Sequence, residues 1–402
     1  MGPARIGNHR GRVMRIPPFE LERFQSLHEH RVEINLTESG VEPLEVGELL
    51  GPDAAGLLLD QPLAYTQSNG TPELRAAVAA TLPGAAEHHV LVANGGAEAN
   101  FVACWRLIEP GDEVVVMQPN YGQVQGLAEG FGAIVRPWPL REERAQPSPR
   151  WAPDVDELRA LVSARTKLVA ICNPNNPTGA RLTEAEVAAV CEIAGRHGAW
   201  VLSDEIYRGV EHDGVETPSV WGRTERVIVT GGLSKAYGLP GLRIGWAIAA
   251  EDMAAELWSR RDYTTIAPSA LSDRLARHAL VPARRTALLE RTRRLIAANF
   301  PIVGAWLDAH AGNLAWVPPE AGAIGFVRYG HDIGSTALAD RLRQTAGVLV
   351  VPGDHFGLDG WLRIGCGGRA ASLREGLARL DRVLADLPQR AARFPAGADA
   401  AG

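Results

Sequence analysis

The chain has 402 residues, of which 46% are hydrophobic, so it can bury a large core and is too long for a single core of ordinary size. This content excludes general disorder, and two domains are expected. The formal net charge of −6 disfavours nucleic-acid partners, because binding a phosphate backbone requires a positive field. A small-molecule substrate is the better expectation.

Cysteine usage and hydropathy exclude two further classes. The four cysteines, Cys104, Cys172, Cys191 and Cys366, are far apart and lack paired metal-ligand spacing. This pattern predicts reduced thiols, no metal site and a cytoplasmic location. No stretch approaches the ~20 consecutive apolar residues that a membrane span requires, so no membrane partner is expected.

The two ends of the chain differ from its middle. Four arginines lie in the first segment: Arg5, Arg10, Arg12 and Arg15. Because no apolar run comes after them and Pro17 and Pro18 interrupt the chain there, this segment predicts an untargeted basic tail. The last residues are small and without periodicity, which predicts disorder. The expected organisation is a basic tail (1–15), an N-terminal arm with part of a small domain (16–48), a large domain (49–278), a small C-terminal domain (279–388) and a disordered tail (389–402).

Between Val90 and Ala250, short β-branched runs alternate with longer amphipathic segments, which predicts an α/β fold with a mostly parallel central sheet covered by helices. The candidate strands are HVLVA, EVVVMQ, AIVRPW, KLVAIC, AWVLS, RVIVT and RIGWAIA. Clusters of Gly, Asn, Asp or Ser follow nearly all of them, and ligands bind outside the carboxyl ends of such strands. Beyond Leu280, a long helical stretch and weaker strands around IGFVRYG, GVLVVPG and WLRIGC predict a smaller α+β domain.

The first two clusters are turns with a possible binding role. ANGGAEANF (93–101) places Gly95 and Gly96 at a helix start, where free backbone N–H groups can bind a phosphate. A simple tight turn is the alternative for such a glycine pair. NPNNPTG (173–179) is typical of a rigid turn, since Asn, Pro and Gly are common turn residues.

The next two clusters carry charged side chains in apolar surroundings. SDEIY (203–207) places Asp204 at the end of an apolar strand, where a buried carboxylate needs a partner such as the protonated ring nitrogen of a cofactor. A solvated surface acid is the alternative. TGGLSKAYGLPGLRIGW (230–246) places Lys235 among small and apolar residues, which favour a nucleophilic amine and make it the Schiff-base candidate. Arg243 follows, and its guanidinium presents a fixed fork of donors suited to a phosphate.

The segments NPNNPTG, SDEIY and SKAYGLPGLRIGW, in this order and spacing, resemble the large domain of the class I and II aminotransferases, the fold type I pyridoxal-phosphate enzymes. The resemblance covers roughly residues 35 to 385. It implies the aminotransferase-type fold, in which a large domain binds pyridoxal 5'-phosphate. By this resemblance Lys235 holds the cofactor as a Schiff base and Asp204 pairs with its pyridine nitrogen. Asn176 and Tyr207 match residues that hydrogen-bond its phenolic oxygen, and Tyr207 joins Lys235 and Asp204 as a predicted catalytic residue.

The resemblance also implies contacts around the rest of the cofactor. Tyr121 matches the aromatic residue that stacks on the ring, with a core tyrosine as the alternative. The phosphate cup is expected at Gly95, Gly96, Ala97, Ser234 and Arg243. Many relatives carry a serine three positions before the lysine, where this chain has Gly232, so one phosphate hydrogen bond is absent or supplied otherwise.

Two further matches concern the substrate and a partner subunit. Arg363, in WLRIGCGG, matches the arginine that binds a substrate α-carboxylate in a bidentate pair, next to Asn176. Tyr65, in AYTQSNGTPELR, resembles the tyrosine that reaches the phosphate of the neighbouring subunit. The resemblance therefore implies a homodimer with shared active sites.

Transamination is the predicted reaction: Lys235 moves the α-proton of an amino acid, and the amino group passes to an oxo acid. The segment INLTESGVEPLEVGELL (34–50) favours an alternative, because it resembles capreomycidine synthase-like members, which act as cyclases or oxidases on arginine-derived amino acids. Glu38 would then bind a guanidinium, or it is an ordinary loop acid. A non-catalytic ligand sensor is a third hypothesis, disfavoured because Lys235 and Asp204 are both present.

Overall fold

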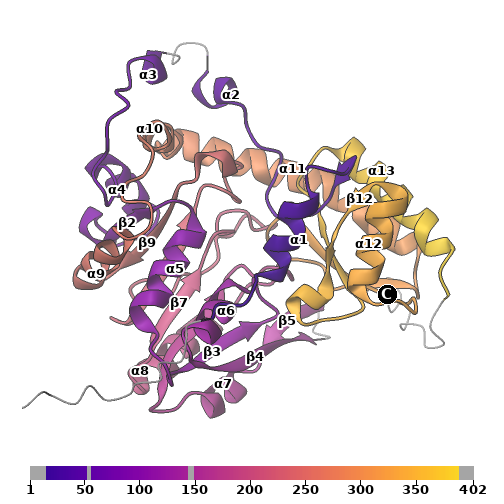
Figure 1. The fold of residues 1–402 in the computed structure, drawn as a ribbon, viewed down its shortest axis with the longest axis horizontal. Helices are drawn as coiled ribbons and strands as arrows, with labels where there is room; N and C mark the ends of the chain where they lie inside the picture. Colours follow the sequence, from indigo (N-terminus) through magenta and orange to yellow (C-terminus); the bar gives the residue numbers. More distant parts are fainter. Residues whose placement is uncertain (1–14, 52–55, 144–148, 389–402) are drawn as a thin grey trace, which may run out of the picture.

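The computed structural model describes residues 15–51, 56–143 and 149–388. The predicted disordered tail (389–402) and nearly all of the predicted basic tail lie outside the described residues. Two β-sheets lie side by side, a larger one with its helices and a smaller one with its own, and the long helix α11 (Pro282–Ala309) runs from one part to the other (Figure 1).

The larger sheet has eight strands in the order β2-β9-β8-β7-β6-β3-β4-β5. β3, β4, β6, β7 and β8 pair in parallel, while β9 and β5 run antiparallel to their neighbours, so the predicted mostly parallel sheet is confirmed. Seven of the strands were predicted, and β5 was not. Their bounds are β2 (Val90–Ala93), β3 (Glu113–Gln118), β4 (Ile134–Glu143), β5 (Arg150–Pro153), β6 (Thr166–Cys172), β7 (Trp200–Asp204), β8 (Val227–Gly232) and β9 (Gly245–Ala249).

Helices cover both faces of this sheet because alternate strand residues point to opposite sides. Val114 and Val116 pack in one core with α5, α6 and α9, whereas Val115 and Met117 pack in the other core with α4, α7, α8 and α10. α8 begins with a capping box between Thr183 and Glu186. The helices are α4 (Pro72–Ala79), α5 (Gly96–Leu107), α6 (Gln123–Gly130), α7 (Val155–Leu161), α8 (Glu184–Arg196), α9 (Glu251–Arg261) and α10 (Ala270–Ala279).

The smaller part is an antiparallel sheet in the order β10-β11-β14-β13, packed with α12 and α13. The N-terminal arm joins this part through a separate two-stranded sheet, in which β1 pairs in parallel with β12. The bounds are β1 (Ile34–Asn35), β10 (Leu314–Trp316), β11 (Ile324–Tyr329), β12 (Val348–Leu349), β13 (Val351–Pro352), β14 (Trp361–Gly365), α12 (Ser335–Ala346) and α13 (Ala370–Ala385).

The long helix α11 belongs to both parts. Its Leu289 and Ile296 pack in the core of the larger part, whereas Ile302 and Trp306 pack in that of the smaller part. A division of the chain at residue 279 therefore stays a prediction. The remaining elements are α1 (Glu20–His28), α2 (Val46–Leu50), α3 (Gly56–Leu59) and the 3-10 turns η1 (Glu87–His89), η2 (Pro240–Leu242) and η3 (Gly353–Phe356).

Candidate active site

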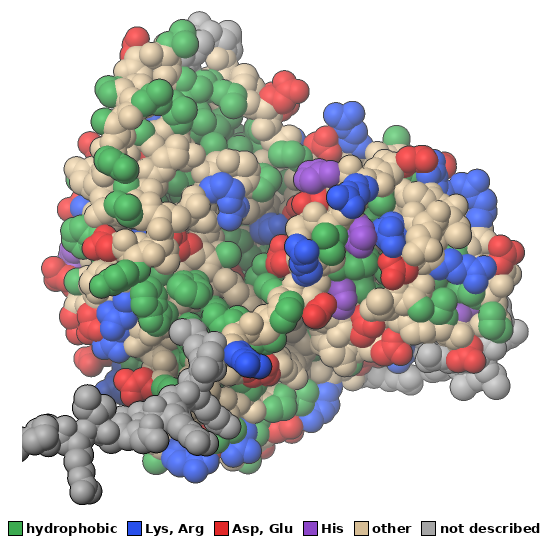
Figure 2. Space-filling model, viewed as in Figure 1, with side chains coloured by type: hydrophobic (Ala, Val, Ile, Leu, Met, Phe, Trp, Pro, Cys, Tyr) green, Lys and Arg blue, Asp and Glu red, His purple; other side chains and the backbone are tan. Residues whose placement is uncertain are grey.

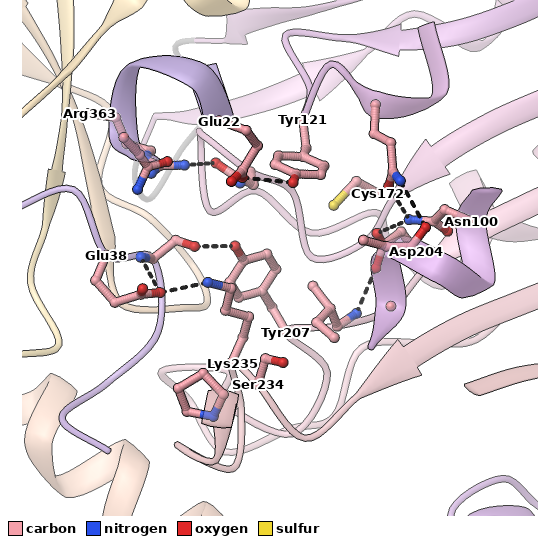
Figure 3. Close-up of a pocket in the computed structure, with 18 of the residues that line it drawn as sticks. Glu22, Glu38, Asn100, Tyr121, Cys172, Asp204, Tyr207, Ser234, Lys235 and Arg363 are labelled. Atoms are coloured by element: carbon pink, nitrogen blue, oxygen red, sulfur yellow. Dashed lines mark hydrogen bonds and ion pairs between the residues drawn. The ribbon is translucent and has the colours of Figure 1, made fainter. Parts of the chain in front are cut away.

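A cavity of about 350 Å³ lies at the carboxyl ends of β6, β7 and β8, where the larger part meets β14 and the N-terminal arm. This is the edge at which the sequence predicted a site. Figure 3 shows the cavity. Eleven of the predicted site residues line it: Glu38, Gly96, Ala97, Tyr121, Asn176, Asp204, Tyr207, Ser234, Lys235, Arg243 and Arg363.

Lys235 follows β8 in the loop that leads to η2. Its Nζ atom donates a hydrogen bond to Glu38 Oε1 at 2.6 Å, and one quarter of its side chain is exposed. The charge of Lys235 is the main reason that the pKa of Glu38 falls to about 2. An amine that lines a polar cavity can reach a carbonyl compound that binds there.

Asp204 lies at the end of β7 and has a partner that the sequence did not reveal. Asn100 Nδ2 on α5 donates to Asp204 Oδ2 at 2.9 Å, and the backbone N–H of Ile206 donates to Oδ1 at 3.1 Å. Thr230 Oγ1 in turn donates to Asn100 Oδ1. Burial raises the pKa of Asp204 above its ordinary value, although the two hydrogen bonds act in the opposite direction.

Asn100 follows Gly96 by four residues, so both lie on the same face of α5. This spacing could have identified Asn100 as a site residue from the sequence. If Gly96 lines the cavity, the residue one helical turn later points in the same direction. Asn100 is 2% exposed, and a buried amide of this kind is placed to fix a carboxylate rather than to meet solvent.

Tyr207 and Arg363 are buried and are both linked to the N-terminal arm. The hydroxyl of Tyr207 donates to Ser39 Oγ at 2.9 Å, and burial raises the pKa of this phenol. Arg363 donates from Nη1 to Asn176 Oδ1 at 3.0 Å and from Nη2 to the carbonyl oxygen of Thr37 at 2.6 Å. Sequence reasoning missed Thr37 and Ser39, since they are ordinary polar residues in an arm far away along the chain.

Arg363 retains an unused donor. Its side chain is 1% exposed, and its Nε atom has no hydrogen-bond partner among the described residues. Leaving a buried guanidinium donor unpaired is costly, so an anion in the cavity would stabilise this arrangement. A carboxylate suits it, because guanidinium and carboxylate form paired, charge-assisted hydrogen bonds.

The predicted phosphate cup is built from close backbone contacts. Gly95 has φ 92°, and a Cβ atom there would lie 2.3 Å from Arg243 Nη2. A Cβ atom on Gly245 would lie 2.3 Å from the carbonyl carbon of Gly95. Arg243, itself left-handed with φ 50°, donates from Nη1 to Ser234 Oγ at 3.3 Å. The first turn of α5, one hydroxyl and one guanidinium therefore converge where an anion can bind.

Gly232 and Tyr65 lie in surroundings that the sequence did not predict. A Cβ atom at Gly232 would lie 3.0 Å from both Ile206 Cδ1 and the carbonyl oxygen of Ile244, so a serine there would require these neighbours to shift. Tyr65 does not line the cavity and is 87% exposed. Its predicted contact with a neighbouring subunit stays a prediction.

Helix α1 covers the open side of the cavity between the two parts (Figures 1 and 3). The hydroxyl of Tyr121 donates to Glu22 Oε1 at 2.7 Å, and the ring of Phe19 meets the Tyr121 ring edge-on. On the other side, the Phe24 ring contacts His355. Glu22, Glu29 and Glu38 thus bring three carboxylates to the wall formed by α1 and the arm.

The described part of the chain contains neither a metal-binding cluster nor a membrane-spanning helix. Within 15–51, 56–143 and 149–388, no group of three or more His, Cys, Asp or Glu side chains could hold a metal ion. No helix of the described segments combines the length and the apolar character needed to cross a bilayer.

Comparisons with known proteins agree with this geometry. The family described as "Aminotransferase class I and II" matches residues 59–380. The capreomycidine synthase of Streptomyces vinaceus is 36% identical over 380 residues, which cover 92% of this chain and 94% of the relative.

Two solved structures share the fold. A PLP-dependent aminotransferase from Streptococcus suis matches with a TM-score of 0.86 and 31% identity, covering 94% of this chain and all of the other. The PLP-dependent cyclase OrfR matches with a TM-score of 0.83 and 27% identity, covering 94% and 99% of the two chains. The predicted fold is confirmed, and the chain belongs to the class I and II aminotransferase family.

Proposed function

We propose that this protein is a pyridoxal-phosphate-dependent aminotransferase that moves the α-amino group of an amino acid to an oxo acid. The observation that carries the proposal is the convergence of Lys235, Asp204 and Arg363 on one cavity, together with the anion site at the start of α5. A lysine, a carboxylate and a guanidinium whose Nε donor has no partner among the described residues are the groups needed for covalent attachment, for a ring cation and for a substrate carboxylate.

The residues present fit the cofactor. The backbone around Gly95, which approaches too closely for a Cβ atom, and Arg243 would hold its phosphate. Asp204 would hold the ring nitrogen, and Asn176 and Tyr207 would hold the phenolic oxygen. Tyr121 would lie against the ring. When bound, the cofactor supplies a ring that accepts the electron pair released at the substrate α-carbon.

The protein's own groups then have distinct tasks. Lys235 carries a proton at Nζ between positions inside the cavity. Asp204 must be charged to hold a ring cation, and that cation offsets the desolvation that raises the pKa of Asp204. Arg363 orients the substrate through its carboxylate, using the Nε donor that has no partner in the described chain.

A dimer with shared sites is part of this proposal. Four large apolar side chains of the larger part are more than 80% exposed: Leu59, Leu63, Tyr65 and Tyr263. Hydrophobic side chains gather at the top left of Figure 2, where Figure 1 shows α2 and α3. Exposed apolar patches of this kind support an interface. Mixing inactive Lys235→Ala subunits with inactive Tyr65→Ala subunits should restore activity if subunits share sites.

The cofactor assignment has a direct test. The purified protein, loaded with the cofactor, is reduced with borohydride and mapped by mass spectrometry, and the added mass is expected on Lys235. Adding an amino acid should convert the visible absorption band, and an oxo acid should restore it. A protein that cannot be loaded with the cofactor, or that carries the added mass on another residue, contradicts the proposal.

A cytoplasmic location is also proposed, because all four cysteines are buried free thiols.

A second function is favoured by the carboxylates Glu22, Glu29 and Glu38 on the cavity wall. They suit a cationic side chain, and one relative is named capreomycidine synthase. We therefore keep a cyclase or oxidase acting on an arginine-derived amino acid as the alternative. Incubation with arginine, 3-hydroxyarginine and a panel of other amino acids with 2-oxoglutarate separates the two: amine transfer supports the first, and conversion without transfer supports the second.

A further inference from the structure

Three consecutive residues of the N-terminal arm each contact a different reactive group of the site. The carbonyl oxygen of Thr37 accepts from Arg363, Glu38 Oε1 accepts from Lys235, and Ser39 Oγ accepts from Tyr207. We call residues 37–39 the contact strip. Figure 3 shows Glu38 directed at Lys235 from outside the central sheet. Lys235 therefore faces a carboxylate that does not come from the sheet that carries the lysine.

The contact strip is fixed by close backbone packing. The backbone N–H of Gly365 donates to the carbonyl oxygen of Leu36 at 2.7 Å. A Cβ atom on Gly365 would lie 2.2 Å from the carbonyl oxygen of Glu38, and one on Gly367 would lie 2.1 Å from that of Gly40. The backbone of the arm and the backbone at Gly365 and Gly367 approach too closely to leave room for a side chain between them. The contact strip therefore cannot shift away from Lys235 without breaking this packing.

The carboxylate of Glu38 is oriented and charged. Its Oε1 atom also accepts from the backbone N–H groups of Ser39 at 2.9 Å and Gly40 at 3.0 Å. With its pKa lowered to about 2, chiefly by Lys235, Glu38 stays ionised at neutral pH. Arg363 and Tyr207 also interact electrostatically with Glu38, but neither is hydrogen-bonded to it.

We propose that Glu38 is a positioning residue for Lys235: whenever the lysine is not joined to the cofactor, the carboxylate of Glu38 holds its amine in a charge-assisted hydrogen bond that must break before the amine can react. The inference rests on the proposed function. Joining requires the neutral amine: a carbon–nitrogen double bond forms between Nζ and the aldehyde carbon, the aldehyde oxygen leaves as water, and the ammonium proton passes to solvent. Glu38 thus restrains the reactivity of Lys235 and fixes the position of its Nζ atom before the reaction.

The chain permits a clean test, because its only lysines are Lys167 and Lys235. Cofactor-free protein is treated with formaldehyde and a borane reductant at fixed pH, and methylation at each lysine is measured by peptide mapping. Glu38→Gln should raise the rate at Lys235 about threefold to fivefold, the range expected for losing a partly exposed ion pair. The rate at Lys167, the internal control, should not change.

Matched variants exclude a steric explanation. Glu42→Gln is the control on the same arm, because Glu42 pairs with Arg369 instead of the lysine. Glu38→Asp, which keeps the charge, should return the Lys235 rate toward that of the unmodified protein. Added salt should accelerate methylation of Lys235 in the unmodified protein and not in Glu38→Gln, because it screens the pair.

Equal Lys235 rates in the unmodified protein and in folded Glu38→Gln, or no effect of salt, would overturn the proposal. Failure of the proposed function is distinguishable, because it would appear as absence of borohydride-trapped cofactor on Lys235. The methylation rates do not depend on the cofactor.

Discussion

The floor and the roof of the cavity are built differently. The floor comes from the carboxyl ends of β7 and β8, and its Asp204 is held by the buried Asn100. The roof comes from α1 and the contact strip, and its Glu22 and Glu38 remain well exposed. A buried, desolvated floor suits chemistry common to a family, whereas an exposed, charged roof suits selection among substrates.

The largest effect is expected on the floor at Lys235. Lys235→Ala should abolish covalent attachment of the cofactor and lower kcat at least about 1,000-fold, because the proton carrier is lost. Cofactor trapping and steady-state rates measure this. Lys167→Ala is the matched control and should retain full activity. Normal turnover by the Lys235→Ala protein would show that the reaction does not require this lysine of the floor.

Asp204→Asn should have the next largest effect. The amide keeps the shape of the carboxylate but not its charge, so kcat should fall about 100-fold to 1,000-fold, as when one electrostatic partner of a reacting group is removed. Asp213→Asn, at an exposed acid paired with Arg181, is the control. Comparable kcat values for Asp204→Asn and Asp213→Asn would mean that the reaction does not require the buried carboxylate of Asp204.

Arg363 connects the floor to the roof, because it donates hydrogen bonds to Asn176 and to Thr37 of the contact strip. Arg363→Lys tests its role in binding the substrate carboxylate. A single ammonium cannot replace a guanidinium in a paired contact, so kcat/KM for amino acids should fall about tenfold to 100-fold, mostly through KM. Amines without a carboxylate should be little affected. Arg369→Lys, on the exposed arm contact, serves as the control. A similar loss with both substrate types would assign Arg363 a structural role only.

The smallest effect is expected on the roof at Glu22. Glu22→Gln can still accept the hydrogen bond from Tyr121, so the variant removes charge without removing that contact. The value of kcat/KM for cationic amino acids should fall about threefold to tenfold relative to neutral ones. Glu20→Gln, exposed on the same helix, is the control. An equal loss for both substrate classes would contradict a selective roof.

The sequence predicted the floor better than the roof for a physical reason. Strands such as β3 (EVVVMQ) have a local pattern that burial imposes, and the polar residues after them must meet at one edge of a parallel sheet. Asp204 and Lys235 followed from that rule. β5 was missed because its four residues, RWAP, are too short to have a period.

The roof depends on contacts between distant residues. Ser39 and Tyr207 are 168 residues apart, and Glu38 and Lys235 are 197 apart. No local periodicity encodes such pairs, because they arise from how the arm and the helices pack on the sheet. Glu38 was identified only through a resemblance, as a candidate for a guanidinium, and its contact with Lys235 was not anticipated.

The helix shared by the two parts has a mechanical consequence. Along α11, the last buried side chain in the core of the larger part is Ile296 and the first in that of the smaller part is Ile302, and the partly buried Phe300 packs against both cores. Pro301 lies between them and has no N–H to donate to the carbonyl of Ala297. The helix therefore resists bending least where it passes from one core to the other, so that a hinge at this point would open or narrow the cavity while leaving both cores intact.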